Sequence, residues 1–104
     1  MGQVTWSTKA SLNLQAIHEY IATDSRFYAQ RFVRGLIQAT RKLEDHPRCG
    51  RIVPELPTRG FREVVHRGYR IVYRIAQPGD EIEVLAVVHG ARDVKSALRH
   101  WELS

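Results

Sequence analysis

The hydrophobic pattern of this chain changes its period halfway along, and that change limits the possible folds more than any other feature of the sequence. In residues 8–45, apolar side chains recur every three or four positions, which is the spacing of an amphipathic helix. From residue 61 onward they alternate with polar ones, as in a β-strand with one buried face. The sequence therefore predicts a helical first half and a sheet-forming second half, an arrangement typical of α+β domains.

The first half is expected to contain two helices. Ser7 is a suitable N-cap for a helix over residues 8–22, and residues 23–25 interrupt the pattern before a second helix over residues 27–45. Because the interruption is only three residues long, the two helices should form a hairpin.

A segment rich in structure-breaking residues separates the two halves. Residues 46–60 hold three Pro and two Gly, so we expect a long loop without any regular element. Beyond it, Arg67-Gly68 is typical of a two-residue hairpin turn. The expected strands are residues 4–6, 61–66, 69–76 and 82–89, and a weak helix follows over residues 93–102. The sequence thus predicts one α+β domain over residues 1–104 in the order β-α-α-β-β-β. The helical hairpin packs on one face of an antiparallel sheet, and a short C-terminal helix ends the chain.

The composition excludes several classes of protein. A chain of 104 residues is too short for a multidomain enzyme or a large cofactor-binding fold. The single cysteine, Cys49, excludes a disulfide framework, and no ligand spacing supports zinc, so we expect neither a metal nor another cofactor. No apolar run approaches the ~20 residues that span a bilayer, and the N-terminus lacks the pattern of a signal peptide. We therefore expect a cytoplasmic protein with no membrane partner.

Positive charge is concentrated in the middle of the chain. Of the 16 Lys and Arg residues, which face 11 Asp and Glu, 13 are Arg, whose planar guanidinium can bind carboxylate or phosphate through two hydrogen bonds. The alternation in residues 69–75 predicts that Tyr69 and Ile71 lie under the helices, with Arg70 and Arg74 on the opposite, uncovered face of the sheet.

Four residues could converge on that uncovered face into a concave basic patch: Arg62, Arg70, His89 and Arg92. A structural alternative remains open at this point, in which Arg70 is an ion-pair partner of Glu63 or Glu83.

Several spaced motifs give the chain a resemblance to a known family. They are Ala10-x3-Leu14-x2-Ile17-x2-Tyr20, Pro47-x2-Gly50-Arg51-x-Val53-Pro54-Glu55, Tyr69-Arg70-x-Val72-Tyr73 and Val88-His89-Gly90-Ala91-Arg92-Asp93. In this order the series resembles the RelE/ParE toxin superfamily over residues 4–94. The resemblance implies a small toxin of a type II toxin–antitoxin pair, held inactive in a hetero-oligomer by an antitoxin that a neighbouring gene encodes. Since the chain is basic, we expect an acidic antitoxin segment whose affinity falls as salt rises.

The superfamily contains two mechanisms, and the resemblance leaves both open. RelE-like members cut messenger RNA on the ribosome, and in this chain the matching candidate catalytic residues are Arg62, Arg70, His89 and Arg92. ParE-like members lack that nuclease set and poison DNA gyrase. Residues 93–98 lack the tyrosine that RelE-like members carry after the last strand, so the chain resembles the ParE branch more closely. The prediction is a ParE-like growth inhibitor of DNA gyrase, with a ribosome-dependent endoribonuclease acting on mRNA as the alternative.

Overall fold

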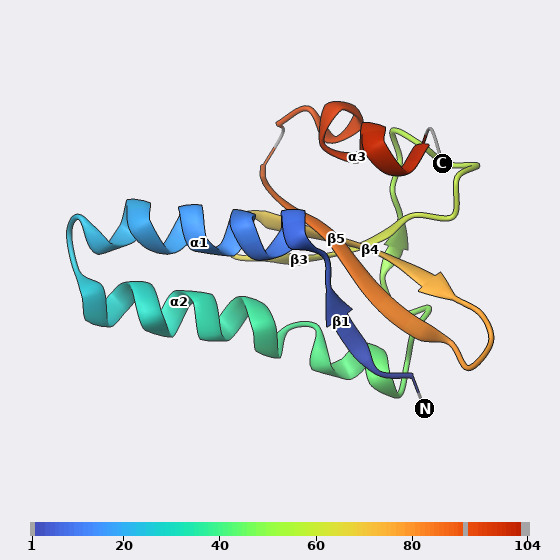
Figure 1. Ribbon diagram of the computed structural model, residues 1–104, viewed down its shortest axis with the longest axis horizontal. Coiled ribbons are helices and arrows are strands. Elements are labelled where there is room, and N and C mark those ends of the chain that lie inside the picture. The colour runs from blue at the N-terminus through green and yellow to red at the C-terminus, as the bar shows by residue number, and fades with distance from the viewer. Residues whose placement is uncertain (1, 91, 103–104) are drawn as a thin grey trace.

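The computed structural model describes residues 2–90 and 92–102, so Ala91 and both ends of the predicted domain lie outside the described residues. Along the described chain the elements are β1 (Val4–Trp6), α1 (Thr8–Ala22), α2 (Arg26–Gln38), the 3-10 helix η1 (Arg41–Glu44), β2 (Arg51–Ile52), β3 (Arg62–His66), β4 (Tyr69–Ala76), β5 (Glu81–His89) and α3 (Val94–Glu102) (Figure 1). The sheet order is β1-β5-β4-β3-β2. This arrangement confirms the predicted α+β fold with its helical hairpin and C-terminal helix.

Two serine side chains define where the hairpin helices begin. The Ser7 hydroxyl accepts a hydrogen bond from the backbone N–H of Ala10 at 3.0 Å, and the Ser25 hydroxyl accepts one from that of Tyr28 at 3.1 Å. Each bond satisfies one of the N–H groups that a helix leaves unpaired at its start. α1 has the predicted bounds, and α2 begins one residue earlier than predicted.

The second helix is shorter than the sequence predicts. It ends at Gln38 instead of residue 45, and the 3-10 helix η1 replaces its last turn. The hydroxyl of Thr40 donates a hydrogen bond to the carbonyl of Ile37 at 2.7 Å. A side chain thus satisfies a carbonyl near the end of the helix. Thr40 and Leu43 are nevertheless buried. The apolar stripe thus predicted the burial correctly but not the helix geometry.

The expected absence of regular structure in residues 46–60 is also wrong in one place. β2 forms there and pairs antiparallel with β3, with Arg51 opposite Glu63 and Ile52 opposite Arg62. A strand of two residues is too short to show an alternating pattern, and its formation depends on partners ten and twelve positions away. One sheet pairing also differs from the prediction, since β1 runs parallel to β5.

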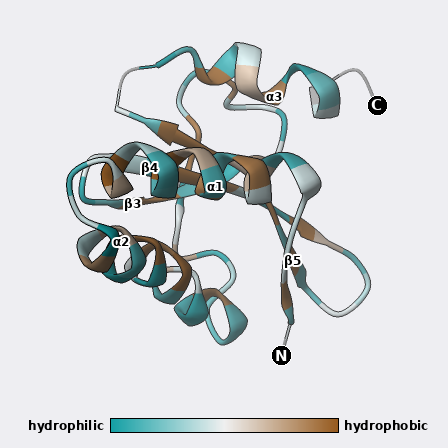
Figure 2. Ribbon diagram, turned by 60° about the vertical axis from the view of Figure 1, so that its left-hand side comes forward, coloured by the Kyte–Doolittle hydropathy of each residue, from teal (hydrophilic) through white to brown (hydrophobic). Residues whose placement is uncertain are grey.

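The sheet is covered on both faces, whereas the sequence predicts one open face. The hairpin covers one face, where Ile71 and Tyr73 are buried as predicted. On the other face lie α3 and the loop after β2 (Figures 1 and 2). A second apolar cluster there includes Val72 of the sheet and Leu98 of α3. The register between β4 and β5 shifts between Val72 and Tyr73, which leaves Leu85 of β5 without a partner on β4, and Leu85 belongs to this cluster. The predicted basic patch therefore has no open sheet face on which to lie.

Side chains of α1 cover the edge of β5 where β1 stops. The Ser7 hydroxyl donates to the carbonyl of Leu85 at 3.1 Å, and the Asn13 side-chain oxygen accepts from the N–H of Val87 at 3.0 Å. These bonds satisfy strand groups that would otherwise form an open edge. They also place α1 beside the C-terminal end of β5.

Candidate functional site

The strand register places three of the four candidate catalytic residues on two different faces of the sheet. Residues opposite each other on paired strands share a face of the sheet. Arg62 lies opposite Tyr73 and His89 opposite Tyr69, which places both on the hairpin face. Arg70 lies opposite Val65 and Val88, which places it on the α3 face. The prediction that these residues converge on one face is therefore wrong.

Arg70 lies at the centre of a network of ion pairs. Its Nε donates to Glu63 Oε1 at 2.8 Å, and its Nη2 lies 2.7 Å from the same oxygen as an ion pair. Its Nη1 and Nη2 donate to the two carboxylate oxygens of Glu55 at 2.7 Å each. Arg51 binds the remaining oxygen of Glu63 at 2.6 Å. The structural alternative stated for Arg70 thus holds for Glu63, while the sequence missed Glu55 as a partner.

Burial makes the charges of this network depend on one another. Arg70 is 7% exposed and Glu63 is 1% exposed, so both charges depend on their partners and not on water. The hydrogen bonds from Arg70 hold the pKa of the Glu55 carboxyl at about 2, below the ordinary 4.5. The same bonds, which Glu55 accepts, raise the pKa of Arg70 above its ordinary value. All five guanidinium protons of an arginine can bond, and here both terminal nitrogens are directed at Glu55.

This depressed pKa predicts how stability depends on pH. Because Glu55 has a pKa of about 2 in the folded chain, against an ordinary 4.5 for a carboxyl exposed to water, its ionised form stabilises the fold above pH 4.5. That contribution disappears as the pH falls toward 2. We therefore expect the difference in free energy of unfolding between the wild type and Glu55→Gln to shrink over this range, measured by urea denaturation at a series of pH values. A difference that stays constant down to pH 2 would contradict the assignment.

Arg62 is the first residue of β3, and its guanidinium holds the bend before β2 in place. Its Nη1 donates to the carbonyls of Arg48 and Gly50, at 3.2 and 2.8 Å. The guanidinium thus supports the loop that carries the Pro47-x2-Gly50-Arg51 motif. It is directed away from Arg70, which lies on the other face of the sheet.

His89 and Arg92 do come together, in a groove of about 720 Å³ at the end of the sheet. We call this the end groove. It is lined by residues of α1, the start of β4, the end of β5, the turn before α3 and α3 itself: Lys9, Asn13, Ala16, Ile17, Tyr20, Tyr69, Val87, Val88, His89, Arg92, Asp93 and Ala97. The rings of His89 and Tyr69 are 4.8 Å apart. The Asp93 carboxylate accepts hydrogen bonds from the backbone N–H and the hydroxyl of Ser96 at the start of α3.

The sequence also missed the contribution of α1 to this groove. Lys9, Asn13 and Tyr20 follow one another at intervals of four and seven residues, so they lie on one stripe of α1. That spacing was a usable signal. It could not be interpreted without knowing that this stripe faces the end of β5.

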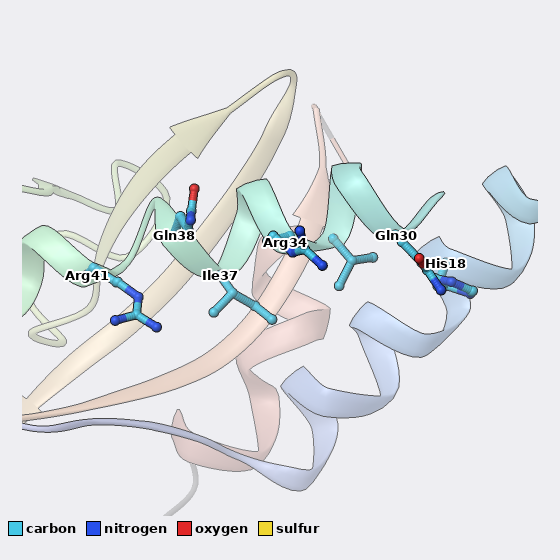
Figure 3. A pocket seen from close by; sticks show the side chains of 7 residues that line it. His18, Gln30, Arg34, Ile37, Gln38 and Arg41 are labelled. Atoms are coloured by element: carbon cyan, nitrogen blue, oxygen red, sulfur yellow. The ribbon is translucent and has the colours of Figure 1, made fainter. Parts of the chain in front are cut away.

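A second hollow, of about 530 Å³, lies between the two helices of the hairpin (Figure 3). Its lining comes from α1, α2 and η1 and is formed by His18, Gln30, Val33, Arg34, Ile37, Gln38 and Arg41. Among the residues that the structure describes, Arg34 and Arg41 make no salt bridge to an acidic side chain. This hairpin hollow is therefore a basic surface whose lining also includes the apolar side chains of Val33 and Ile37.

The described ranges 2–90 and 92–102 hold neither a metal site nor a membrane span. Within them, no group of three His, Cys, Asp or Glu side chains is placed to hold a metal ion. No helix of those ranges combines the length and the apolar character needed to cross a membrane.

The chain is similar to known toxins in sequence and in structure. Residues 4–94 match the family model described as the ParE toxin of the type II toxin–antitoxin system parDE. A curated relative, Toxin RelE2 of Caulobacter vibrioides, is 36% identical over 93 residues, covering 88% of this chain and 99% of the relative.

Solved structures share the fold. A chain of the chromosomal ParDE system from P. aeruginosa superposes with a TM-score of 0.68 at 24% identity, covering 86% of this chain and 97% of that one. A chain of the RelBE2 toxin–antitoxin complex from Mycobacterium tuberculosis gives a TM-score of 0.63 at 21% identity, covering 85% and 96%. Together with the sequence matches, the shared fold confirms the resemblance that the spaced motifs indicated. The chain belongs to the ParE toxin family of the RelE/ParE superfamily, and it is a toxin of a type II toxin–antitoxin system.

Proposed function

We propose that this toxin inhibits growth in the manner of the ParE branch, by acting on DNA gyrase without cutting RNA, and that a cognate antitoxin neutralises it. The observation that carries this proposal is the state of Arg70. A nuclease needs free hydrogen-bond donors directed at the phosphate on which negative charge develops. Arg70 is 7% exposed, and Glu55 and Glu63 occupy its guanidinium.

Two further features support the ParE branch. Residues 93–98 contain no tyrosine that could exchange a proton with RNA. The matching family model is itself described by the parDE system. Both features agree with an action that does not involve cutting RNA.

The test is induction of the toxin alone in cells, scored in parallel for DNA topology and for messenger RNA. We expect growth arrest, reduced supercoiling activity and trapped cleaved DNA, with intact transcripts and continued protein synthesis. Purified toxin should inhibit gyrase in vitro without added ribosomes. Transcripts cut within codons, together with unchanged gyrase activity, would overturn the proposal.

The end groove favours a second candidate, a ribosome-dependent endoribonuclease. Imidazole and guanidinium groups from His89 and Arg92 lie in the same groove, where they could move a proton and stabilise a phosphate. The name of the relative Toxin RelE2 is in keeping with this branch. If the second candidate is correct, His89→Ala and Arg92→Ala should each abolish mRNA cleavage while leaving the fold intact.

The antitoxin is proposed to present an acidic segment to the hairpin hollow, because Arg34 and Arg41 line it. We expect the dissociation constant of the complex to rise with salt, and Arg34→Glu to weaken binding at least about tenfold through like-charge repulsion. Lys95→Glu makes the same change of charge on α3 and should have a much smaller effect. Titration calorimetry at several salt concentrations measures both. Equal losses for the two variants would place the interface elsewhere.

A further inference from the structure

We propose that Glu55 determines which ligands reach Arg70: its carboxylate occupies the position at which a phosphate group would bind, and its removal would open a phosphate-binding site. The phosphate could be free or part of a nucleic-acid backbone. The inference rests on the proposed function, since it gives the reason why a chain with this strand arginine would not act on RNA.

The geometry between Arg70 and Glu55 is the one that arginine uses for phosphate. Two parallel hydrogen bonds of 2.7 Å join Nη1 and Nη2 to the two carboxylate oxygens. A phosphate presents two oxygens to the same planar fork, and such paired, charge-assisted bonds are the strong kind. Glu55 therefore fills the bidentate position, and the chain supplies its own anion there.

The two carboxylates of the network differ in how they are held. The Glu63 side chain is 0% exposed and binds both Arg51 and Arg70 from within the fold. The Glu55 side chain is 36% exposed and meets Arg70 from the solvent side. Glu63 thus acts as the permanent counterion, while Glu55 blocks the access of outside anions.

Removing the Glu55 carboxylate should leave the surrounding structure in place. Its neighbours Val53 and Leu56 are 0% and 8% exposed and anchor the loop in the apolar cluster under α3. Arg70 keeps Glu63 as a partner, so its charge is not left uncompensated. Arg51, which is close enough to influence the Glu55 carboxylate, would then add a second cation to the opened site.

The chain offers a matched control for this change. Glu83 pairs with Arg74 at 2.9 Å near the surface of the same sheet. Glu83→Ala and Glu55→Ala remove one negative charge each, but only Glu55→Ala exposes Arg70. A comparison of the two therefore separates a specific site from a general increase in positive charge.

The experiment titrates inorganic phosphate into the wild type, Glu55→Ala and Glu83→Ala and follows the Nε–Hε resonance of Arg70 by NMR. Far-ultraviolet circular dichroism and urea unfolding establish that each variant is folded; if Glu55→Ala is not, Glu55→Ser replaces it in the same titration. We expect the variant at position 55 to bind phosphate about tenfold more tightly than Glu83→Ala, because it gains a charge-assisted bidentate contact, with a shift of the Arg70 resonance. A fluorescent single-stranded oligonucleotide is then added to the phosphate-bound variant. Displacement of phosphate assigns the site to a nucleic-acid backbone, and no displacement assigns it to free phosphate.

Equal phosphate affinity in the position-55 and Glu83 variants, or an Arg70 resonance that does not move, would overturn the inference. So would a wild type that already binds phosphate as tightly as the position-55 variant. Failure of the proposed function is a separate result, because it is detected as transcript cleavage by the wild-type toxin in cells.

Discussion

Arg70→Ala is expected to lower the free energy of unfolding by about 3–5 kcal/mol, the usual cost of removing one partner from a buried ion pair. Glu63 would keep its charge at a fully buried position, and its Oε1, which now accepts from Arg70, would lose that donor. Arg51 bonds only Oε2 and is mostly exposed, so it cannot replace the lost contact. Urea denaturation of the two proteins measures the difference.

Arg74→Ala is the control for this prediction. Arg74 lies on the same strand four residues later and pairs with Glu83 near the surface, where both side chains are at least 32% exposed. Such a pair contributes only about 0–1 kcal/mol. If Arg70→Ala costs no more than Arg74→Ala, the network is not the stabilising feature that its geometry implies.

The expected loss of stability in Arg70→Ala determines which variants can test activity. If the toxin were a nuclease, Arg70 would be the first residue to replace, and loss of toxicity would be taken as loss of catalysis. In this fold the same loss would follow from unfolding alone. Variants of exposed residues such as His89 and Arg92 test catalysis without that ambiguity.

Local patterns predicted the elements of the fold well. Helical spacing, a serine cap and a two-residue turn each depend on neighbours within a few positions, and α1 and β4 have the predicted bounds. Arg67 and Gly68 both have positive φ, of 48° and 85°, as the predicted hairpin turn requires. Features that depend on distant partners were missed, namely β2 and the parallel pairing of β1.

The candidate site was harder to predict because it depends on register between strands. The alternation of residues along β4 correctly placed Ile71 and Arg70 on opposite faces of the sheet. Alternation within one strand does not show which residue of β3 or β5 lies opposite a given residue of β4. A shift of one residue in this register moves a side chain to the other face. The sequence therefore grouped Arg62 and His89 with Arg70 wrongly. It also left out Glu55, because a carboxylate in a loop has no period that indicates its partner.

Gly50→Ala is expected to destabilise the fold by about 3 kcal/mol, at the upper end for overpacking a core. A Cβ at Gly50 would lie 2.5 Å from the Tyr73 hydroxyl and 2.7 Å from the backbone oxygen of Glu63. Tyr73 is fully buried, and its hydroxyl accepts from the Gly50 N–H at 3.0 Å and donates to the Pro47 carbonyl at 2.7 Å. The tyrosine therefore cannot move aside without giving up both bonds.

This steric reason explains the glycine of the Pro47-x2-Gly50-Arg51 motif, which the sequence alone identified without a cause. Cys49→Ala is the matched control, since Cys49 is exposed and adjacent, and it should change stability by less than about 0.5 kcal/mol. Combining Gly50→Ala with Tyr73→Phe should restore little of the lost stability, because the contact with the Glu63 backbone remains when the tyrosine hydroxyl is gone. Full recovery in that double variant would mean that the hydroxyl alone excludes a side chain at position 50. A double variant no more stable than Gly50→Ala alone would mean that the loop must approach β3 closely. This approach brings Arg51 to Glu63.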